Sequence, residues 1–359
     1  MTDVVINGRF LGQSFSGVQR FAFNVVRALD ALLKESPTAM RGRRFRILSP
    51  RGIRDPGFQT IEHHAVGQLR GQAWEQFELP WHARGALLVN LGNTAPLATR
   101  GQVVTIHDVA SWVIPNSFTP GFRLWYRFLI PRVAHRASTI LTVSQFSAAE
   151  IVKFLGVPSA RLRVIYNSAE HVLEQVPEPD ILKRAGGGGR IVLSVGNRAP
   201  HKNSGVVLQA EQLLLDRNYT FVHAGDELTH IFSALDASSD TPHALGRVTD
   251  GELRALYEAA DCFVFPSIYE GFGMPPLEAM LCGCAVVASS AASMPEICGD
   301  AALYFDPLDP VGLANQIARI MDDDVLRDTL AERGRARARE FSWKRSARAL
   351  LAALDAVPA

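Results

Sequence analysis

The chain has 359 residues, 47% of them hydrophobic and 20% charged, which is typical of a globular protein with room for two domains. No apolar run is long enough to predict a transmembrane helix. Residues 1–170 contain 20 Lys and Arg against 10 Asp and Glu, although the net charge of the whole chain is only +1. This asymmetry suggests that one half faces an anionic partner, and the lack of any nucleic-acid-binding motif argues against nucleic acid.

The sequence also predicts the compartment. The N-terminal stretch MTDVVINGRF lacks the basic and apolar regions of a secretory signal. The four cysteines match no zinc-binding spacing and are expected to be buried thiols. We therefore expect a cytoplasmic protein.

Short apolar runs alternate with amphipathic stretches along the first half. A strand predicted at Val4–Ile6 leads into a glycine-containing loop and a helix over Phe21–Leu33. The loop has neither dinucleotide-binding nor P-loop spacing, but Gly17 would let a ligand approach its backbone. The following elements are strands at Phe45–Leu48, Leu87–Asn90, Val103–Ile106, Ile140–Val143 and Leu162–Ile165, and a helix at Ser144–Leu155 capped by Ser144.

The strand ending at Ile106 is followed by His107 and Asp108. Ligands bind at the carboxyl ends of strands in parallel sheets, and Asp108 could fix the tautomer of the histidine ring. A lone histidine is more often structural, so both interpretations stay open.

Residues 121–137 interleave aromatic and apolar side chains with four arginines. One interpretation is a helix packed on its own domain. The alternative is an interfacial helix that lies on an anionic membrane surface.

Prolines and a run of four glycines predict an interdomain linker over residues 172–190. Strand–helix alternation then resumes, with Arg198 and Lys202 following a strand at Ile191–Val195. Two cations on a strand-end loop suit a diphosphate, although they could also be ordinary surface charges. Residues 322–324 are three successive aspartates, which resemble a metal-binding cluster of acids, but because they lie between predicted helices we interpret them as a solvated turn.

The stretch 261–290 predicts a strand, a loop in which Gly271 and Gly273 flank Phe272, a helix and a second strand. Glu270 precedes this loop and Glu278 lies in the first turns of the helix. Each acid alone has an ordinary explanation, as a solvated loop residue or as a complement to the helix dipole. Together they flank a helix N-terminus that would favour an anion, which indicates a binding site.

These motifs together resemble glycosyltransferase family 4. Glu270 and Glu278 form its E-x7-E pattern in YEGFGMPPLEAM, and Gly196, Arg198 and Lys202 form its diphosphate motif. The stretch GELRALYEAADCFVFPSIYEGFG and the tripeptide Phe341-Ser342-Trp343 are further hallmarks. Residues 90–97 and 103–118 resemble the mannosyltransferase branch that builds O-antigens and exopolysaccharides.

The resemblance implies an α/β protein of the GT-B fold, with two doubly wound Rossmann-like domains facing across a cleft. The expected domains are residues 1–171, with 342–359 crossing back, and residues 191–341. The implied reaction is a retaining hexosyl transfer, most readily of mannose from GDP-mannose, to a lipid-linked oligosaccharide at the inner face of the cytoplasmic membrane. The nucleotide sugar is a substrate, and neither a metal nor another cofactor is implied.

The resemblance also assigns residues to roles. Glu278 would hold the donor ribose, Glu270 the sugar and phosphate, and Arg198 with Lys202 the departing diphosphate. His107 would contact the sugar near the reacting carbon. The remaining donor contacts would come from Gly17, Gly196, Val248, Leu253, Gly271, Phe272, Gly273 and Met274, and the acceptor contacts from Gly17 and Asp108.

Alternatives remain at this stage. The same fold could use a UDP- or dTDP-linked sugar, or carry out epimerase or phosphorylase chemistry. It could also be a sugar-binding protein without catalysis, although such a protein would not need a diphosphate clamp.

Overall fold

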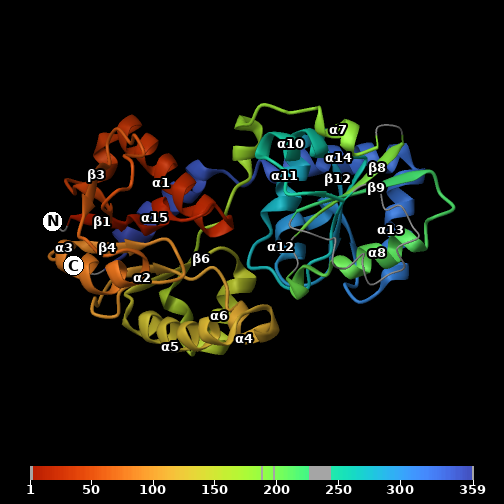
Figure 1. Ribbon diagram of the computed structural model, residues 1–359. Helices are drawn as coiled ribbons and strands as arrows, with labels where there is room; N and C mark the ends of the chain where they lie inside the picture. The colour runs from red at the N-terminus through yellow and green to blue at the C-terminus, as the bar shows by residue number, and fades with distance from the viewer. Residues whose placement is uncertain (1–2, 187–188, 197–198, 226–243, 358–359) are drawn as a thin grey trace. The chain divides into compact units, whose positions relative to one another are not determined.

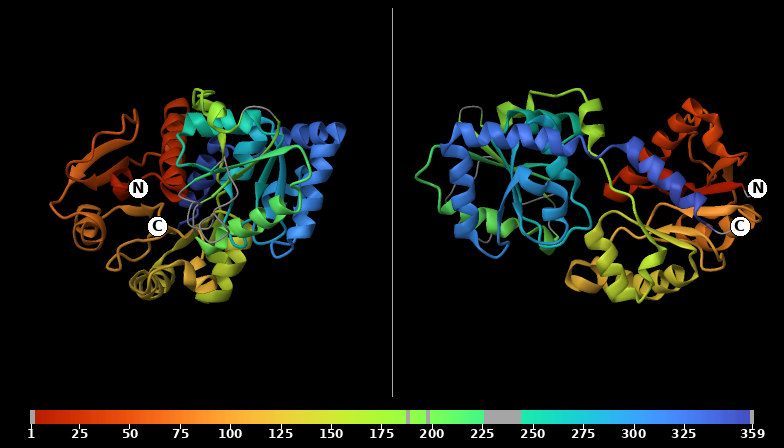
Figure 2. Two further views of the ribbon diagram at one scale, coloured as in Figure 1. Left: turned by 45° about the vertical axis from the view of Figure 1, so that its right-hand side comes forward. Right: turned by 180° about the vertical axis from the view of Figure 1, so that it is seen from behind.

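The computed structural model describes residues 3–186, 189–196, 199–225 and 244–357. The chain divides into two compact units. The N-terminal unit consists of the residues up to Asn167 together with those from Ser342 on, and the C-terminal unit of Ser168–Phe341. Each unit is a twisted parallel sheet with helices on both faces (Figure 1, Figure 2). This is the pair of Rossmann-like domains that the alternation of strands and helices predicts.

The sheet of the N-terminal unit has the strand order β3-β2-β1-β4-β5-β6-β7, and every paired strand runs parallel to its neighbour. The central strands are apolar runs buried on both faces, as parallel sheets require. The edge strand β3 has the polar sequence EHHAV and was not predicted. The strands are β1 (Val4–Asn7), β2 (Phe45–Pro50), β3 (Glu62–Val66), β4 (Leu87–Asn90), β5 (Val103–Thr105), β6 (Thr139–Thr142) and β7 (Leu162–Val164).

Helices α1 and α15 lie side by side on one face of this sheet, and α5 and α6 cover the other (Figure 1, Figure 2). Phe21 of α1 meets Trp343 of α15 edge to face, with ring centroids 6.4 Å apart. The C-terminal helix therefore returns to the N-terminal unit, as the family resemblance implies. The helices are α1 (Gly17–Glu35), α2 (Gly71–Ala73), α3 (Leu79–His82), α4 (Ala110–Val113), α5 (Pro120–Arg136), α6 (Gln145–Leu155) and α15 (Trp343–Asp355).

The C-terminal unit has a parallel sheet with the order β10-β9-β8-β11-β12-β13. Helices α8 and α13 pack on one face, and α10 and α11 on the other (Figure 1). The strands are β8 (Arg190–Val195), β9 (Tyr219–Ala224), β10 (Ala244–Gly246), β11 (Cys262–Phe265), β12 (Ala285–Ser289) and β13 (Ala302–Phe305). The helices are α7 (Ile181–Arg184), α8 (Ser204–Gln212), α10 (Asp250–Ala259), α11 (Met274–Cys282), α12 (Met294–Cys298), α13 (Pro310–Asp322) and α14 (Asp324–Ala338).

The segment expected to be a linker, 172–190, is instead part of the C-terminal unit. It contains the end of a short 3-10 helix over Glu170–Glu174 and the helix α7. Val172 and Ile181 are buried, and the backbone N–H of Glu178 donates to the carbonyl of Gly251 at 3.1 Å. The prolines and glycines indicated a loose connection, but the apolar residues between them anchor the segment to the domain.

Local signals set several helix ends where the sequence placed them. The hydroxyl of Ser144 accepts the backbone N–H of Ser147 at 2.9 Å and caps α6. Helix α11 begins with prolines in its first turn and ends at Gly283, whose φ of +87° suits glycine. Helix α1 begins at Gly17, four residues before the predicted start.

Candidate functional site

The loop between β11 and α11 is the centre of the candidate site in the C-terminal unit. Gly273 precedes α11 with φ of +88°, and a side chain there would collide with Met294. The hydroxyl of Ser293 lies 3.0 Å from the carbonyl oxygen of Glu270 and 2.9 Å from that of Phe272. Because these carbonyls are held by Ser293 and the loop is buried from Gly271 to Gly273, its shape is fixed before any ligand binds.

The structure brings the predicted cation Lys202 to this loop. Its ammonium lies 2.5 Å from Oε1 of Glu270, and both side chains are only partly exposed. The backbone N–H of Ile268 donates to the carbonyl of His201 at 2.8 Å, which ties the segment of Lys202 to the loop. Gly196 directly follows β8, and its backbone N–H donates to the carbonyl of Ala224 at 3.0 Å. The other predicted cation, Arg198, lies outside the described residues.

Glu278 belongs to a buried hydrogen-bonded network. Its Oε1 accepts from Nε2 of His171 at 2.8 Å, and its Oε2 accepts from the hydroxyl of Tyr257 at 3.1 Å. Burial raises the pKa of Tyr257 well above its usual value, and the neighbouring carboxylate adds to the shift, so the hydroxyl stays a donor. Glu278 is therefore more than a complement to the helix dipole, because two side chains orient its carboxylate.

Neither partner of Glu278 was singled out from the sequence. Tyr257 lies within the hallmark stretch that ends at Gly273, which was the available signal. His171 stands at the predicted domain boundary, where nothing in the local pattern points to Glu278. Of the other residues expected to contact the donor, Leu253 lies in α10 and Val248 just before it, both partly buried.

His107 in the N-terminal unit is a buried, neutral imidazole. Burial lowers its pKa to about 4, while a hydrogen bond from Nε2 to the carbonyl oxygen of Leu91, at 3.1 Å, opposes the shift. Phe21 packs edge-on against the ring with centroids 4.9 Å apart. The sequence suggested that Asp108 fixes the tautomer of the His107 ring. In the structure a backbone carbonyl, that of Leu91, sets it instead. Asp108 accepts the N–H of Ala110 at 2.9 Å.

The remaining predicted residue of the N-terminal unit, Gly17, is the first residue of α1 and is exposed. It was expected inside a loop. The start of the helix was missed because Ser16, in the cap position, is followed by Gly17 before the apolar residues begin.

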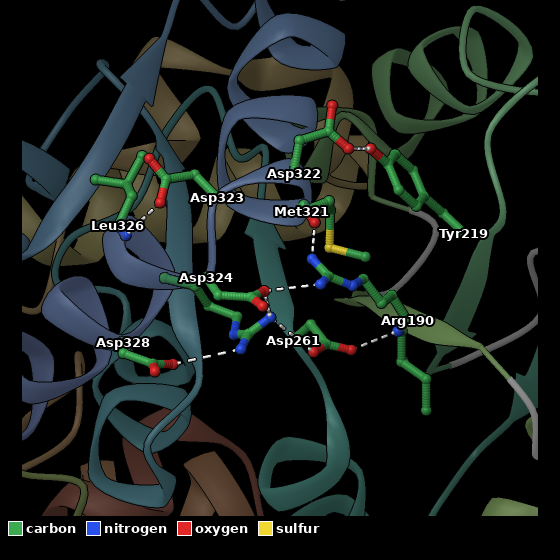
Figure 3. A network of polar contacts seen from close by, with 11 residues as sticks. Arg190, Tyr219, Asp261, Met321, Asp322, Asp323, Asp324, Leu326 and Asp328 are labelled. Carbon is green, nitrogen blue, oxygen red and sulfur yellow. Dashed lines mark hydrogen bonds and ion pairs between the residues drawn. The ribbon is translucent and has the colours of Figure 1, made fainter.

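The three aspartates at 322–324 stabilise the junction of α13 and α14, and Figure 3 shows that they point to different partners. Asp322 accepts from the hydroxyl of Tyr219 at 2.5 Å, Asp323 caps α14 by accepting the N–H of Leu326 at 2.9 Å, and Asp324 pairs with Arg190 at 2.7 Å. Within the part of the chain that the structure describes, no cluster of three or more His, Cys, Asp or Glu is arranged to hold a metal.

Comparison with known proteins supports the family. The family model described as "Glycosyltransferase Family 4" matches residues 15–172, and the model described as "Glycosyl transferases group 1" matches residues 183–337. The chain is 34% identical to the O-antigen chain mannosyltransferase B of Escherichia coli over 303 residues, which is 79% of this chain and 77% of that protein. It is 30% identical to the O-antigen chain mannosyltransferase RfbU of Salmonella typhimurium, covering 71% of this chain and 72% of that one.

Among solved structures, the fold matches that of HepE from Anabaena, determined in complex with UDP and glucose. The TM-score is 0.71 and the identity 20%, over 99% of this chain and 100% of that one. At this identity the match supports the fold alone. Together with the E-x7-E loop and the relatives above, it leads to one conclusion: the chain is a member of glycosyltransferase family 4 with the GT-B fold.

Proposed function

We propose that the chain is a retaining hexosyltransferase of bacterial surface polysaccharide synthesis, which moves mannose from GDP-mannose to a lipid-linked or oligosaccharide acceptor. The observation that carries this proposal is the 34% identity with an O-antigen chain mannosyltransferase along most of both chains. The geometry of the C-terminal unit agrees with it, because Lys202, Glu270 and Glu278 surround one preformed loop.

In this proposal the C-terminal unit binds the donor. The oriented carboxylate of Glu278 retains lone pairs to accept hydrogen bonds from the ribose hydroxyls. Lys202, together with Arg198, offsets the negative charge that develops on the leaving diphosphate, an effect often worth about 3 kcal/mol per contact. The neutral ring of His107 serves as a hydrogen-bonding group for the sugar and not as an acid, because its pKa is about 4.

Retention is the stereochemical outcome that we propose. Glu270 is held by the ammonium of Lys202, which makes its carboxylate a poor nucleophile. The acceptor hydroxyl would therefore attack from the side of the leaving group. The bond from the anomeric carbon to phosphate oxygen breaks, the bond to acceptor oxygen forms, and the leaving diphosphate takes the proton. Since Lys202 and Arg198 carry the compensating charge, we propose that the reaction needs no divalent metal.

A thermal-shift panel tests the donor assignment. We expect GDP and GDP-mannose to raise the unfolding temperature more than UDP, dTDP and their sugars, because a ligand that binds only the folded state stabilises it. The same shifts are expected with EDTA present. A UDP- or dTDP-selective shift would replace the mannosyl assignment, and a shift that disappears with EDTA would contradict metal independence. Donor binding without acceptor-dependent release of GDP would favour the non-catalytic alternative.

We also propose that α5 brings the enzyme to the inner face of the cytoplasmic membrane. Leu124 and Phe128 expose 75% and 43% of their surface, and the guanidinium of Arg132 lies 3.8 Å from the centre of the Phe128 ring. Apolar side chains beside arginines favour an anionic lipid surface. None of the helices in the described ranges is long and apolar enough to cross a membrane.

A further inference from the structure

Glu278 lies where three elements of the C-terminal unit meet. Its helix α11 packs beside α10 (Figure 1), and both helices contact the short 3-10 helix Glu170–Glu174. The 3-10 helix contributes His171, α10 contributes Tyr257, and both side chains are buried. Glu278 itself is only 7% exposed. A carboxylate so far from water depends on neighbouring protein groups for its hydrogen bonds and therefore for its orientation.

The two neighbours hold different oxygens of this carboxylate. Nε2 of His171 lies 2.8 Å from Oε1, and the hydroxyl of Tyr257 lies 3.1 Å from Oε2. A carboxylate only accepts hydrogen bonds, so Nε2 of the histidine is the donor. With a donor on each oxygen, the carboxylate cannot turn about its last bond without breaking a hydrogen bond. Each oxygen still has about one lone pair for a ligand.

The segment that carries His171 is fixed in turn by Arg254 of α10. The guanidinium of Arg254 donates to the carbonyl of Leu173 at 2.8 Å and to that of Gln175 at 2.6 Å. Its Nε is paired with Glu258 at 2.7 Å. The arginine thus attaches the residues that follow His171 to α10, and the histidine is in place before a ligand binds.

Two oxygens that each offer a lone pair match two adjacent hydroxyl groups. A ribose presents such a pair, because its 2′ and 3′ hydroxyls lie on neighbouring carbons and on the same face of the ring. A 2′-deoxyribose presents only one of them. A site built to bond a hydroxyl rejects the analogue that lacks it, because a buried polar group of the site then loses its partner.

We propose that His171 is a positioning residue that gives the donor site its preference for ribonucleoside diphosphates over 2′-deoxyribonucleoside diphosphates. It acts through Oε1 of Glu278 and not through a contact of its own with the nucleotide. The inference rests on the proposed function in taking a nucleotide as the ligand of Glu278. It goes further in excluding dTDP-linked sugars, whose nucleotide is a 2′-deoxyribonucleotide, as donors.

Isothermal titration calorimetry with GDP, 2′-deoxy-GDP, UDP, 2′-deoxy-UDP and dTDP tests this inference. Wild type should bind GDP at least about tenfold more tightly than 2′-deoxy-GDP, the difference expected for one hydrogen bond to a charged group. His171→Leu leaves Oε1 free to turn, so this ratio should fall below about threefold, mainly because GDP binds more weakly. His171→Gln keeps an N–H group near the position of Nε2 and should retain most of the preference.

A purely structural role of His171 would weaken both nucleotides together and leave their ratio unchanged. The matched control is therefore His223→Leu, which removes an equally buried histidine that lies 3.2 Å from the carboxylate of Glu211 in the same unit. This control should keep the wild-type ratio. Arg254→Gln releases the segment of His171 and leaves the histidine itself unchanged, so it should also lower the ratio and remains informative if His171→Leu folds poorly.

An unchanged ratio in both His171→Leu and Arg254→Gln would overturn the inference, and so would a wild type that binds 2′-deoxy-GDP as tightly as GDP or that prefers dTDP. These results are separable from a failure of the proposed function. If UDP binds in place of GDP, and its preference over 2′-deoxy-UDP depends on His171, the mannosyl assignment fails and the role of His171 stands. If GDP binds selectively without any dependence on His171, only the role of His171 fails. If no nucleotide binds wild type, both fail.

Discussion

Glu270 and Glu278 lie on one loop–helix unit, yet their neighbours give them different chemistry. Glu270 is paired with an ammonium in a partly exposed position, so its charge is available to a ligand and partly screened by solvent. Glu278 is buried between a histidine and a tyrosine that direct its oxygens. The pair of Glu270 and Lys202 therefore suits the part of the site where charge develops on the leaving diphosphate. The oriented carboxylate of Glu278 suits hydrogen bonds from the hydroxyl groups of a ribose.

The first prediction at this scale concerns Lys202. Replacing Lys202 by Ala removes the ammonium that would offset the leaving diphosphate and also leaves Glu270 without its partner. We expect turnover to fall at least about 100-fold while circular dichroism stays unchanged. The matched control is Lys183→Ala, which removes the same charge from an exposed ion pair with Asp180 in the same unit. Near-normal turnover in Lys202→Ala would remove Lys202 from the diphosphate site.

A second residue-scale prediction concerns acid stability. The pKa of His107 is lowered from 6.5 to about 4 in the folded chain, so between these values the unfolded chain binds a proton that the folded chain does not. Stability should therefore fall as the pH drops from 6.5 to 4, by up to about 1.4 kcal/mol per pH unit from this group.

Urea unfolding between pH 4 and 7.5 measures this effect. His107→Gln should show a shallower loss of stability toward low pH than wild type, whereas His64→Gln, at an exposed position on β3, should follow wild type. Parallel pH profiles for His107→Gln and wild type would show that the ring is not buried in its neutral form.

At the scale of elements, α5 shows how one sequence pattern can satisfy two interpretations. Its second half packs on the sheet through Leu129, Ile130 and Val133, while Leu124 and Phe128 point outward. Trp125, which the pattern marks as a membrane contact, is only partly exposed and packs against this core. The alternation of aromatic residues and arginines could not separate the two faces, because proline and arginine interrupt the helical period.

The membrane proposal predicts a clear effect of the outward residues. Leu124→Ser combined with Phe128→Ser should reduce sedimentation with phosphatidylglycerol vesicles at least about fivefold, because two apolar side chains no longer enter the interface. Arg127→Glu should add to the loss, since each arginine near an anionic surface contributes about 1 kcal/mol. Val325→Ser removes an equally exposed apolar side chain from α14 and should not matter. Equal sedimentation of all four proteins would refute a membrane role for α5.

In the segment around helix α7, unlike in α5, the sequence pattern led to a single interpretation, and that interpretation was wrong. Prolines and glycines predicted a linker, and the structure contains a folded segment in the C-terminal unit. Composition measures how easily a chain bends, but whether it docks depends on buried positions such as Val172 and Ile181, which are too few to create a periodic signal.

At the scale of the whole molecule, the two halves carry different charge, and the basic half forms most of the N-terminal unit. This agrees with the proposal that the N-terminal unit approaches an anionic membrane.

The sequence by itself determined most of the strands and helices, the two-domain α/β architecture and the family, because periodicity and motif spacing are local properties of the chain. It also singled out Glu270, Glu278 and Lys202 as candidate site residues, because each belongs to a motif that lies within one short stretch of the chain. Only the tertiary structure decided which distant residues meet: His171 reaches Glu278 across 107 positions, and Arg9 and Thr94 meet at Glu75. Those contacts depend on strand order and side-chain packing, which no local pattern records.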